Sequence, residues 1–225
     1  MKKFSRLGEA VAPDGTVLTL HQHDGDYVIR VGGVELMSTR RHASEERLAE
    51  LACRSARHIA GARVLIGGLG FGFTLRAALR CLASDARVIV AELLPEIVAW
   101  NENPSFSLAR EALEDGRVEV RQVDVARVLK ESRGVFDAIM LDVDNGPDPL
   151  TTSGNGRLYG DQGIAMTIAA LRPGGRVAYW SAHADSAFER RLRRAGLAVR
   201  VTKVRAHASG GPWHRMLVGH RAEQP

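Results

Sequence analysis

The alternation of apolar and polar residues divides the chain into a short β-rich start and a longer part in which strands alternate with helices. In the first part, apolar runs of strand length are separated by turns rich in glycine and aspartate: 16–20, 27–31 and 34–37. Short runs punctuated in this way are typical of antiparallel strands joined by tight turns. We therefore expect residues 1–38 to form a small antiparallel β segment, and residues 39–225 to form a second domain.

The second part alternates between apolar strands and helices. A helix is predicted from Glu45 to about Ala60, because leucines and alanines recur there at helical spacing. Beyond Gly61, strand-like runs follow one another: 63–66, 87–91, 118–123, 136–141, 177–180, 197–204 and 213–219. Helical stretches separate all but the last two, which predicts a parallel sheet covered on both faces and closed by an antiparallel hairpin. The expected fold class is α/β, with a Rossmann-like, doubly wound, mostly parallel seven-stranded sheet.

Composition and charge exclude several classes of protein. The 225 residues have a formal net charge of +5, which comes mostly from arginine, and two cysteines. No apolar run approaches the roughly 18 residues of a membrane span, and the cysteines and histidines show neither a disulfide framework nor metal-like spacing. The densest arginine cluster, 189–194, is typical of the solvated face of a helix, so we do not expect nucleic-acid binding. We expect a cytoplasmic protein with no membrane segment and no metal site.

A glycine-rich loop follows the first strand of the second domain and leads directly into a helix. The loop is Gly67-Gly68-Leu69-Gly70-Phe71-Gly72, and its candidate cofactor-binding residues are Gly67, Gly68, Gly70 and Gly72. Glycines let the backbone turn tightly and approach a ligand closely, and a helix N-terminus favours electronegative atoms. A dinucleotide fingerprint requires a further glycine where Phe73 stands. The spacing therefore favours S-adenosylmethionine over a cofactor that contains a pyrophosphate.

Acidic residues stand at the carboxyl ends of the next strands, where ligands bind in doubly wound sheets. Glu92 follows the second strand and is expected to accept hydrogen bonds from the ribose hydroxyls of the cofactor. Asp124 follows the third strand, and two roles are open for it: contact with the adenine amino group, or the N-cap of the helix that begins at Val125. Asp142 and Asp144 follow the fourth strand, and we expect Asp142 to contact the substrate or to act as a base, with Asp144 as its nearest helper.

A long connection rich in glycine, proline and polar residues extends over 145–163. Connections of this length are uncommon unless they are functional. We expect this segment to form a lid over the site; a disordered segment is the alternative.

These motifs resemble the spermidine synthase-like branch of the class I S-adenosylmethionine-dependent methyltransferase fold. The resemblance covers roughly residues 40–205 and includes the turn at 171–175 before the fifth strand. It implies that the glycine loop and Glu92 hold the cofactor, that Asp124 lies on the adenine side, and that the segment from Asp142 onward faces the substrate.

The chain departs from the family pattern at several acidic positions of the aminopropyltransferases. Their G-G-G-D-G-G loop has an acid where this chain has Gly70, their Tyr-His-Glu segment is Ala43-Ser44-Glu45 here, and their D-x-x-D motif is 142–145, which ends in asparagine. A polyamine site needs carboxylates to pair with ammonium groups. The missing acids favour methyl transfer from S-adenosylmethionine to a small acceptor, with Asp142 and Asp144 as candidate catalytic residues.

Two other functions stay open at this point. One is aminopropyl transfer from decarboxylated S-adenosylmethionine to a diamine, as in spermidine synthase. The other is nucleoside binding without catalysis by a protein that keeps the fold. The expected partner is a small-molecule acceptor, and the N-terminal strands leave a homodimer open.

Overall fold

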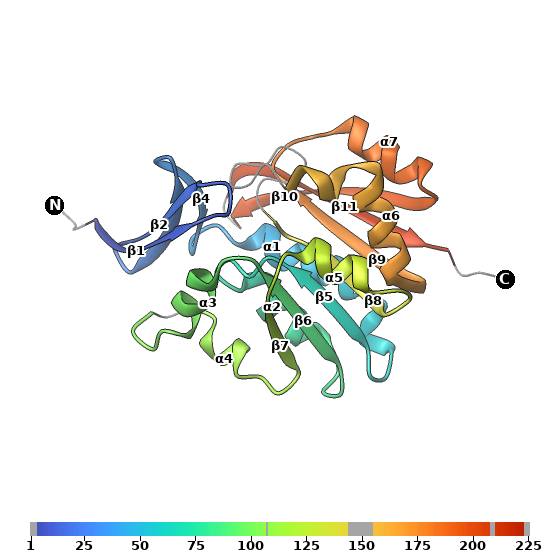
Figure 1. The fold of residues 1–225 in the computed structure, drawn as a ribbon, viewed down its shortest axis with the longest axis horizontal. Coiled ribbons are helices and arrows are strands. Elements are labelled where there is room, and N and C mark those ends of the chain that lie inside the picture. The colour runs from blue at the N-terminus through green and yellow to red at the C-terminus, as the bar shows by residue number, and fades with distance from the viewer. Residues whose placement is uncertain (1–3, 107, 144–154, 208–209, 223–225) are drawn as a thin grey trace.

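The computed structural model describes residues 4–106, 108–143, 155–207 and 210–222, and these residues form two β-sheets (Figure 1). The N-terminal sheet is antiparallel, with its strands in chain order. Its strands are β1 (Ser5–Val11), β2 (Val17–His23), β3 (Asp26–Val31) and β4 (Val34–Ser38). The predicted antiparallel segment is confirmed, with β1 as a strand that the sequence pattern does not predict.

Strand β1 escapes prediction because charged residues and Gly8 interrupt its apolar alternation. Its pairing with β2 shifts register between Arg6 and Gly8. A Cβ on Gly8 would lie 2.6 Å from Nε1 of Trp100, which belongs to helix α3 (Pro95–Glu102). The close approach of this indole therefore requires glycine in the strand.

The larger sheet has the order β10-β11-β9-β8-β5-β6-β7. Its strands are β5 (Arg63–Gly67), β6 (Arg87–Glu92), β7 (Val118–Gln122), β8 (Phe136–Leu141), β9 (Leu171–Ser181), β10 (Leu197–His207) and β11 (Gly210–Arg221). Strands β5 to β9 pair in parallel, whereas β11 is antiparallel to both β9 and β10. The predicted doubly wound sheet with a C-terminal hairpin is confirmed.

Strand β9 begins six residues before the predicted start at Val177. Phe136 pairs with Leu171, but the next pair joins Ala138 to Arg176, so the register shifts between them. The turn over 172–175 therefore interrupts the pairing and does not end the strand.

Helices cover both faces of the larger sheet (Figure 1). They are α1 (Ala43–Cys53), α2 (Phe73–Cys81), α3, α4 (Arg110–Leu113), α5 (Val125–Glu131), α6 (Asp161–Ala170) and α7 (Ser186–Arg194), with short 3₁₀ helices η1 (Ala56–His58) and η2 (Asn155–Tyr159). Along β5, Val64 and Ile66 pack in the core that includes α1, α2 and α3, whereas Leu65 packs in the core that includes α5, α6 and α7. This alternation is the reason why the strands are apolar throughout.

The N-terminal sheet shares its core with the larger unit. Its buried residues Leu18, Leu20 and Ile29 belong to the same apolar cluster as α1, α2 and α3. That residues 1–38 form a domain of their own stays a prediction, as does a homodimer. In the part of the chain that the structure describes, no helix has both the length and the apolar character needed to cross a membrane.

The order in which strands are added to the sheet changes direction between β7 and β8. The chain passes from β5 outward to β6 and β7 and then returns to the other side of β5. At this reversal the Gly68 N–H donates to the Ala91 carbonyl, and the Asp142 N–H donates to the Gly67 carbonyl, both at 2.9 Å. The glycine loop and the end of β8 therefore meet at the edge of the sheet where ligands bind in folds of this kind.

Candidate active site

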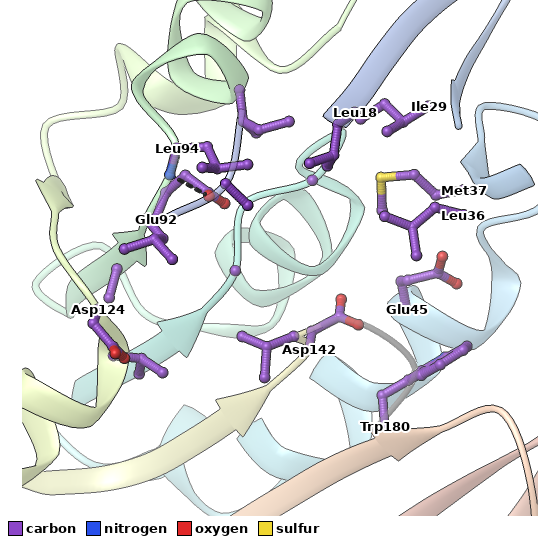
Figure 2. A pocket seen from close by; sticks show the side chains of 18 residues that line it. Leu18, Ile29, Leu36, Met37, Glu45, Glu92, Leu94, Asp124, Asp142 and Trp180 are labelled. Carbon is purple, nitrogen blue, oxygen red and sulfur yellow. Dashed lines mark hydrogen bonds between the residues drawn. The ribbon is translucent and has the colours of Figure 1, made fainter. Parts of the chain in front are cut away.

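A cavity lies at the carboxyl ends of β5, β6 and β8, with residues of the N-terminal sheet as its outer wall (Figure 2). Five of the predicted site residues line it: Gly68, Gly70, Glu92, Asp124 and Asp142. Gly67 and Gly72 belong to the loop but do not line the cavity. Asp144 lies outside the described residues, as does most of the connection that we expect to form a lid, of which the structure shows η2 and the start of α6.

The glycine loop is packed tightly against the rest of the protein. Gly68, Gly70 and Gly72 have φ angles of +89°, +52° and +71°, which residues with side chains rarely adopt. A Cβ on Gly68 would stand 2.4 Å from the Asp142 carbonyl oxygen, and a Cβ on Gly72 would stand 2.3 Å from Cβ of Ala109. We expected the glycines to leave room for a ligand; in the structure, neighbouring protein atoms also require them.

Glu92, at the end of β6, stabilises the glycine loop through a hydrogen bond to its backbone. It is buried, and its two carboxylate oxygens accept hydrogen bonds from the N–H groups of Leu69 at 2.8 Å and Leu94 at 2.9 Å. Figure 2 shows the bond from Leu94. Burial raises the pKa of Glu92, and the hydrogen bonds from backbone N–H groups oppose this shift. The backbone N–H groups of Leu93 and Gly70 also stabilise the ionised carboxylate, so a ribose hydroxyl would share its oxygens with these donors. Its contact with ribose stays a prediction.

Replacing Glu92 by Ala is expected to lower the free energy of unfolding by at least about 2 kcal/mol, because each buried donor left unpaired costs about 1 to 3 kcal/mol. Urea denaturation measures this difference. Glu92→Gln keeps one acceptor oxygen and should lose less. Glu131→Ala, which removes an exposed acid of α5, is the control and should behave like the unmodified protein. Equal stability of the Ala variant and the unmodified protein would show that the carboxylate does not support the loop.

Asp124 has one of its two predicted roles, the N-cap of α5, and it also lines the cavity. Its Oδ1 accepts a hydrogen bond from the Ala126 N–H at 2.8 Å, which makes it the N-cap of α5. It also lines the cavity on the same side as Glu92 (Figure 2). The cap fixes the carboxylate at the rim of the site, and its contact with adenine stays a prediction.

Asp142 and Glu45 form a pair of carboxyl groups on the other side of the cavity (Figure 2). Asp142 follows β8, and its Oδ2 accepts a hydrogen bond from the Thr74 hydroxyl at 2.5 Å. Glu45 lies in the first turn of α1 and is buried. Burial raises the pKa of both groups, and the charge of Asp142 raises the pKa of Glu45 further. Burial favours the protonated form of both carboxyl groups, so a cation in the cavity can replace the proton at small cost.

The raised pKa values make the stability of the ligand-free protein depend on pH. A carboxyl whose pKa is higher in the folded than in the unfolded state binds more protons when folded, so stability falls as pH rises above the ordinary values of 4.5 for Glu45 and 3.8 for Asp142. His214 has the opposite effect, because burial lowers its pKa from 6.5 to about 4 and stability then rises over that interval.

Above about pH 6.5 the contribution of His214 is complete, and comparison with Glu45→Gln between about pH 6.5 and 8.5 separates the contribution of Glu45 from that of Glu92. Over this range Glu45→Gln is expected to gain stability relative to the unmodified protein as pH rises, because it cannot ionise. Thermal unfolding at several pH values measures the difference. If the melting temperatures of the two proteins change equally with pH, the pKa of Glu45 is the same in the folded and the unfolded state, which contradicts the prediction.

The apolar part of the cavity was not predicted. Leu18, Ile29, Leu36 and Met37 of the N-terminal sheet line one wall, and Trp180 of β9 lies beside Glu45 (Figure 2). These residues are far apart in the sequence and look like ordinary core positions. Their place in the site depends on how the two sheets pack, for which the sequence holds no local signal.

The sequence and the structure were compared with those of known proteins. No family model matches the chain. A polyamine aminopropyltransferase of Synechococcus sp. (strain JA-2-3B'a(2-13)) is 27% identical over 157 residues, which cover 67% of this chain and 49% of the relative. The matched region thus spans about half the length of that curated relative.

Solved structures of spermidine synthases have the same fold. A spermidine synthase in complex with the transition-state analogue AdoDATO matches with a TM-score of 0.73 and 17% identity, over 98% of this chain and 73% of that one. The spermidine synthase of Thermotoga maritima matches with a TM-score of 0.74 and 18% identity, over 98% and 74%. A probable spermidine synthase of Corynebacterium glutamicum ATCC 13032 has a TM-score of 0.64 and 17% identity, over 96% and 79%.

The expectation of methyl transfer is wrong, because these relatives are aminopropyltransferases and favour the alternative. That expectation relied on the missing acids at Gly70 and at Asn145, of which Asn145 lies outside the described residues. In the structure a Cβ on Gly70 would stand 2.5 Å from Cε of Met37, so the N-terminal sheet occupies that place, while Glu45 supplies a carboxyl from α1. Giving the missing acids more weight than the carboxyl group that Glu45 retains therefore misjudged the site. The chain has the fold of the spermidine synthases, and its predicted resemblance to the spermidine synthase-like branch of the class I S-adenosylmethionine-dependent methyltransferase fold is confirmed.

Proposed function

We propose that this protein transfers an aminopropyl group from decarboxylated S-adenosylmethionine to a small amine. The observation that carries the proposal is the carboxyl pair, Glu45 and Asp142, which faces the cavity beside the glycine loop. An amine acceptor arrives as an ammonium ion, and buried carboxylates replace the water that it loses. The aminopropyltransferase relative and the spermidine synthase structures support the same class of reaction.

The donor supplies a carbon activated by a sulfonium leaving group. The acceptor nitrogen uses its lone pair to form a C–N bond to that carbon, the C–S bond breaks, and its electrons return to sulfur, which leaves as neutral methylthioadenosine. The nitrogen must lose a proton to expose its lone pair. Glu45 and Asp142 can hold the ammonium group in line and take this proton.

The nucleoside end of the donor would lie on the other side of the cavity. There we assign Glu92 to the ribose hydroxyls and Asp124 to the adenine amino group. Gly68 and Gly70 let the backbone pass close to the donor. Because the apolar wall closes the acceptor side, water is excluded from the reacting atoms.

Release of methylthioadenosine tests the proposal. The purified protein is incubated with decarboxylated S-adenosylmethionine and putrescine, cadaverine, spermidine or a simple alkylamine, and methylthioadenosine is measured by chromatography. Turnover that depends on both the donor and an amine is expected. Binding of the donor, measured by calorimetry, without turnover of any amine would overturn the proposal and favour a nucleoside-binding protein.

A further inference from the structure

Glu45 is connected by hydrogen bonds to a histidine from the other end of the chain. The Ser44 hydroxyl donates to Oε2 of Glu45, and Nδ1 of His214 lies 3.0 Å from the same hydroxyl oxygen. His214 reaches this position because β11 lies beside β9 in the sheet and helix α1 packs on this part of it. The three residues form a continuous network that leads from the carboxyl pair in the cavity to the C-terminal hairpin.

The burial of the network decreases from Glu45 and Ser44, which are buried, to His214, which is partly exposed. The ring of His214 packs edge-on against Trp180, with 4.6 Å between the ring centroids. The charges that lower the pKa of His214 are those of His183 and Arg41, and the charges that raise the pKa of Glu45 are those of Asp142 and Glu46.

Protonation of the imidazole is disfavoured at this place. Burial, with smaller contributions from His183 and Arg41, lowers the pKa of His214 to about 4. The ring therefore stays neutral near pH 7, where it has one N–H and one free lone pair. A neutral imidazole can exist as either of two tautomers, and its hydrogen-bond partner decides which one forms.

The serine has a single proton, and this fixes two arrangements of the network. When Glu45 is ionised, Ser44 donates to Glu45 and His214 donates to Ser44 through Nδ1–H. When Glu45 is protonated and donates to Ser44, the serine donates to Nδ1, and the imidazole proton is on Nε2. The two arrangements differ by one proton in total, so interconverting them carries a proton between the carboxyl group and Nε2 of His214.

We propose that Ser44 and His214 form a proton path that returns Glu45 to its ionised form after each reaction. This inference rests on the proposed function, in which Glu45 takes a proton from the acceptor nitrogen. Ser44 and His214 are positioning residues, because they act on the acceptor only through Glu45.

The proton moves from the acceptor nitrogen through Glu45, Ser44 and His214 to the solvent. The N–H bond of the acceptor breaks and an O–H bond forms on Glu45, whose carboxyl group then turns this proton toward Ser44. The proton passes to the serine oxygen while the serine proton passes to Nδ1 of His214. Nε2 releases its proton to water. One proton is delivered to the solvent and Glu45 is ionised again, while His214 now carries its proton on Nδ1. Exchange of the ring proton with water restores the Nε2–H form that the next transfer requires.

The tautomer of His214 gives a test that does not depend on turnover. In protein labelled with ¹⁵N-histidine, long-range ¹H–¹⁵N spectra distinguish the Nδ1–H and Nε2–H forms. We expect His214 to change from Nε2–H to Nδ1–H as Glu45 ionises with rising pH. Glu45→Gln and Ser44→Ala should each abolish this change, and exposed His58 in the same spectra is the internal control. A His214 tautomer that responds to pH identically in all three proteins would overturn the proposal.

Kinetics with an active amine provide the second test. Ser44→Ala is expected to lower kcat by about 10- to 100-fold near pH 7, less than the full effect of a general base because water can replace the hydroxyl. The KM for the amine should change less than twofold, and the loss should shrink at high pH, where the acceptor carries fewer protons. Ser44→Thr keeps the hydroxyl and should recover most of the rate.

The outcomes separate the two proposals. If the unmodified protein turns over no amine, the proposed function fails, and the histidine spectra still decide whether the network moves a proton. If the protein is active but Ser44→Ala keeps the kcat and pH profile of the unmodified protein, the proton path fails and the proposed function stands. A rise in KM alone would mean that Ser44 only shapes the acceptor site, and it would also overturn the path.

Discussion

Replacing Asp142 by Asn is expected to lower kcat/KM for the amine acceptor by at least about 100-fold, the lower end of what a positioned acid or base contributes. The amide can still accept a hydrogen bond from Thr74, whose hydroxyl lies 2.5 Å from Oδ2 in the unmodified protein. It cannot balance the charge of an ammonium group, and it cannot take a proton. Steady-state release of methylthioadenosine measures the loss.

Folding should not suffer from this substitution. Because burial raises the pKa of Asp142, its ionised form is disfavoured in the folded protein, and removal of the charge relieves that cost. The variant should therefore be at least as stable as the unmodified protein and should still bind methylthioadenosine in calorimetry. Asp115→Asn, which removes a half-buried acid that is paired with Arg117 and does not line the cavity, is the control for activity. Undiminished turnover by Asp142→Asn would exclude Asp142 from the reaction.

Gly68→Ala is expected to weaken binding of methylthioadenosine by at least about 100-fold, or about 2.7 kcal/mol. The new Cβ would stand 2.4 Å from the Asp142 carbonyl oxygen, at a φ of +89° that alanine rarely adopts. Backbone cannot yield as a flexible side chain would, so the end of β8 and the glycine loop must separate. The free energy of unfolding should also fall, by about 2 to 5 kcal/mol, as strain adds to the steric conflict.

Gly15 provides a matched control for this substitution. Its φ of +86° is nearly the same, but nothing lies within 4 Å of the position that a Cβ would take. Gly15→Ala should therefore cost only the backbone strain, about 1 to 2 kcal/mol, and should leave nucleoside binding intact. If the two alanine variants bind methylthioadenosine equally well, the contact with Asp142 does not shape the site.

The local part of the fold and site could be predicted from the sequence. Short apolar strands, the glycine loop and acids at strand ends are signals within a few residues of each other, so Gly68, Glu92 and Asp142 were found. Strand β1 was missed, because its glycine accommodates Trp100 from a distant helix. The same reason hid the roles of Met37 and His214, which depend on packing between segments far apart in the chain.

The error about the reaction had a related cause. A comparison of motifs position by position gave the missing acids at Gly70 and Asn145 more weight than Glu45, but the charge of a cavity is the sum over every element that lines it. Glu45 belongs to α1 and meets Asp142 only after α1 and β8 pack together. The sequence shows that both residues are present but does not show that they lie close together in the fold.

The apolar wall formed by the N-terminal sheet has a consequence for how acceptors can diversify. Leu36 and Met37 face the cavity from a strand that ends at Ser38, whereas Glu92 and Asp124, which we assign to the donor, belong to the larger sheet. In the proposed function, the residues that would contact the carbon skeleton of the acceptor thus lie within 1–38, whereas those that would hold its ammonium group and the donor lie beyond them. Exchanging the segment 1–38 between relatives would change the apolar wall and leave the donor-side residues in place. The new strand would need a residue of suitable size beside Gly70.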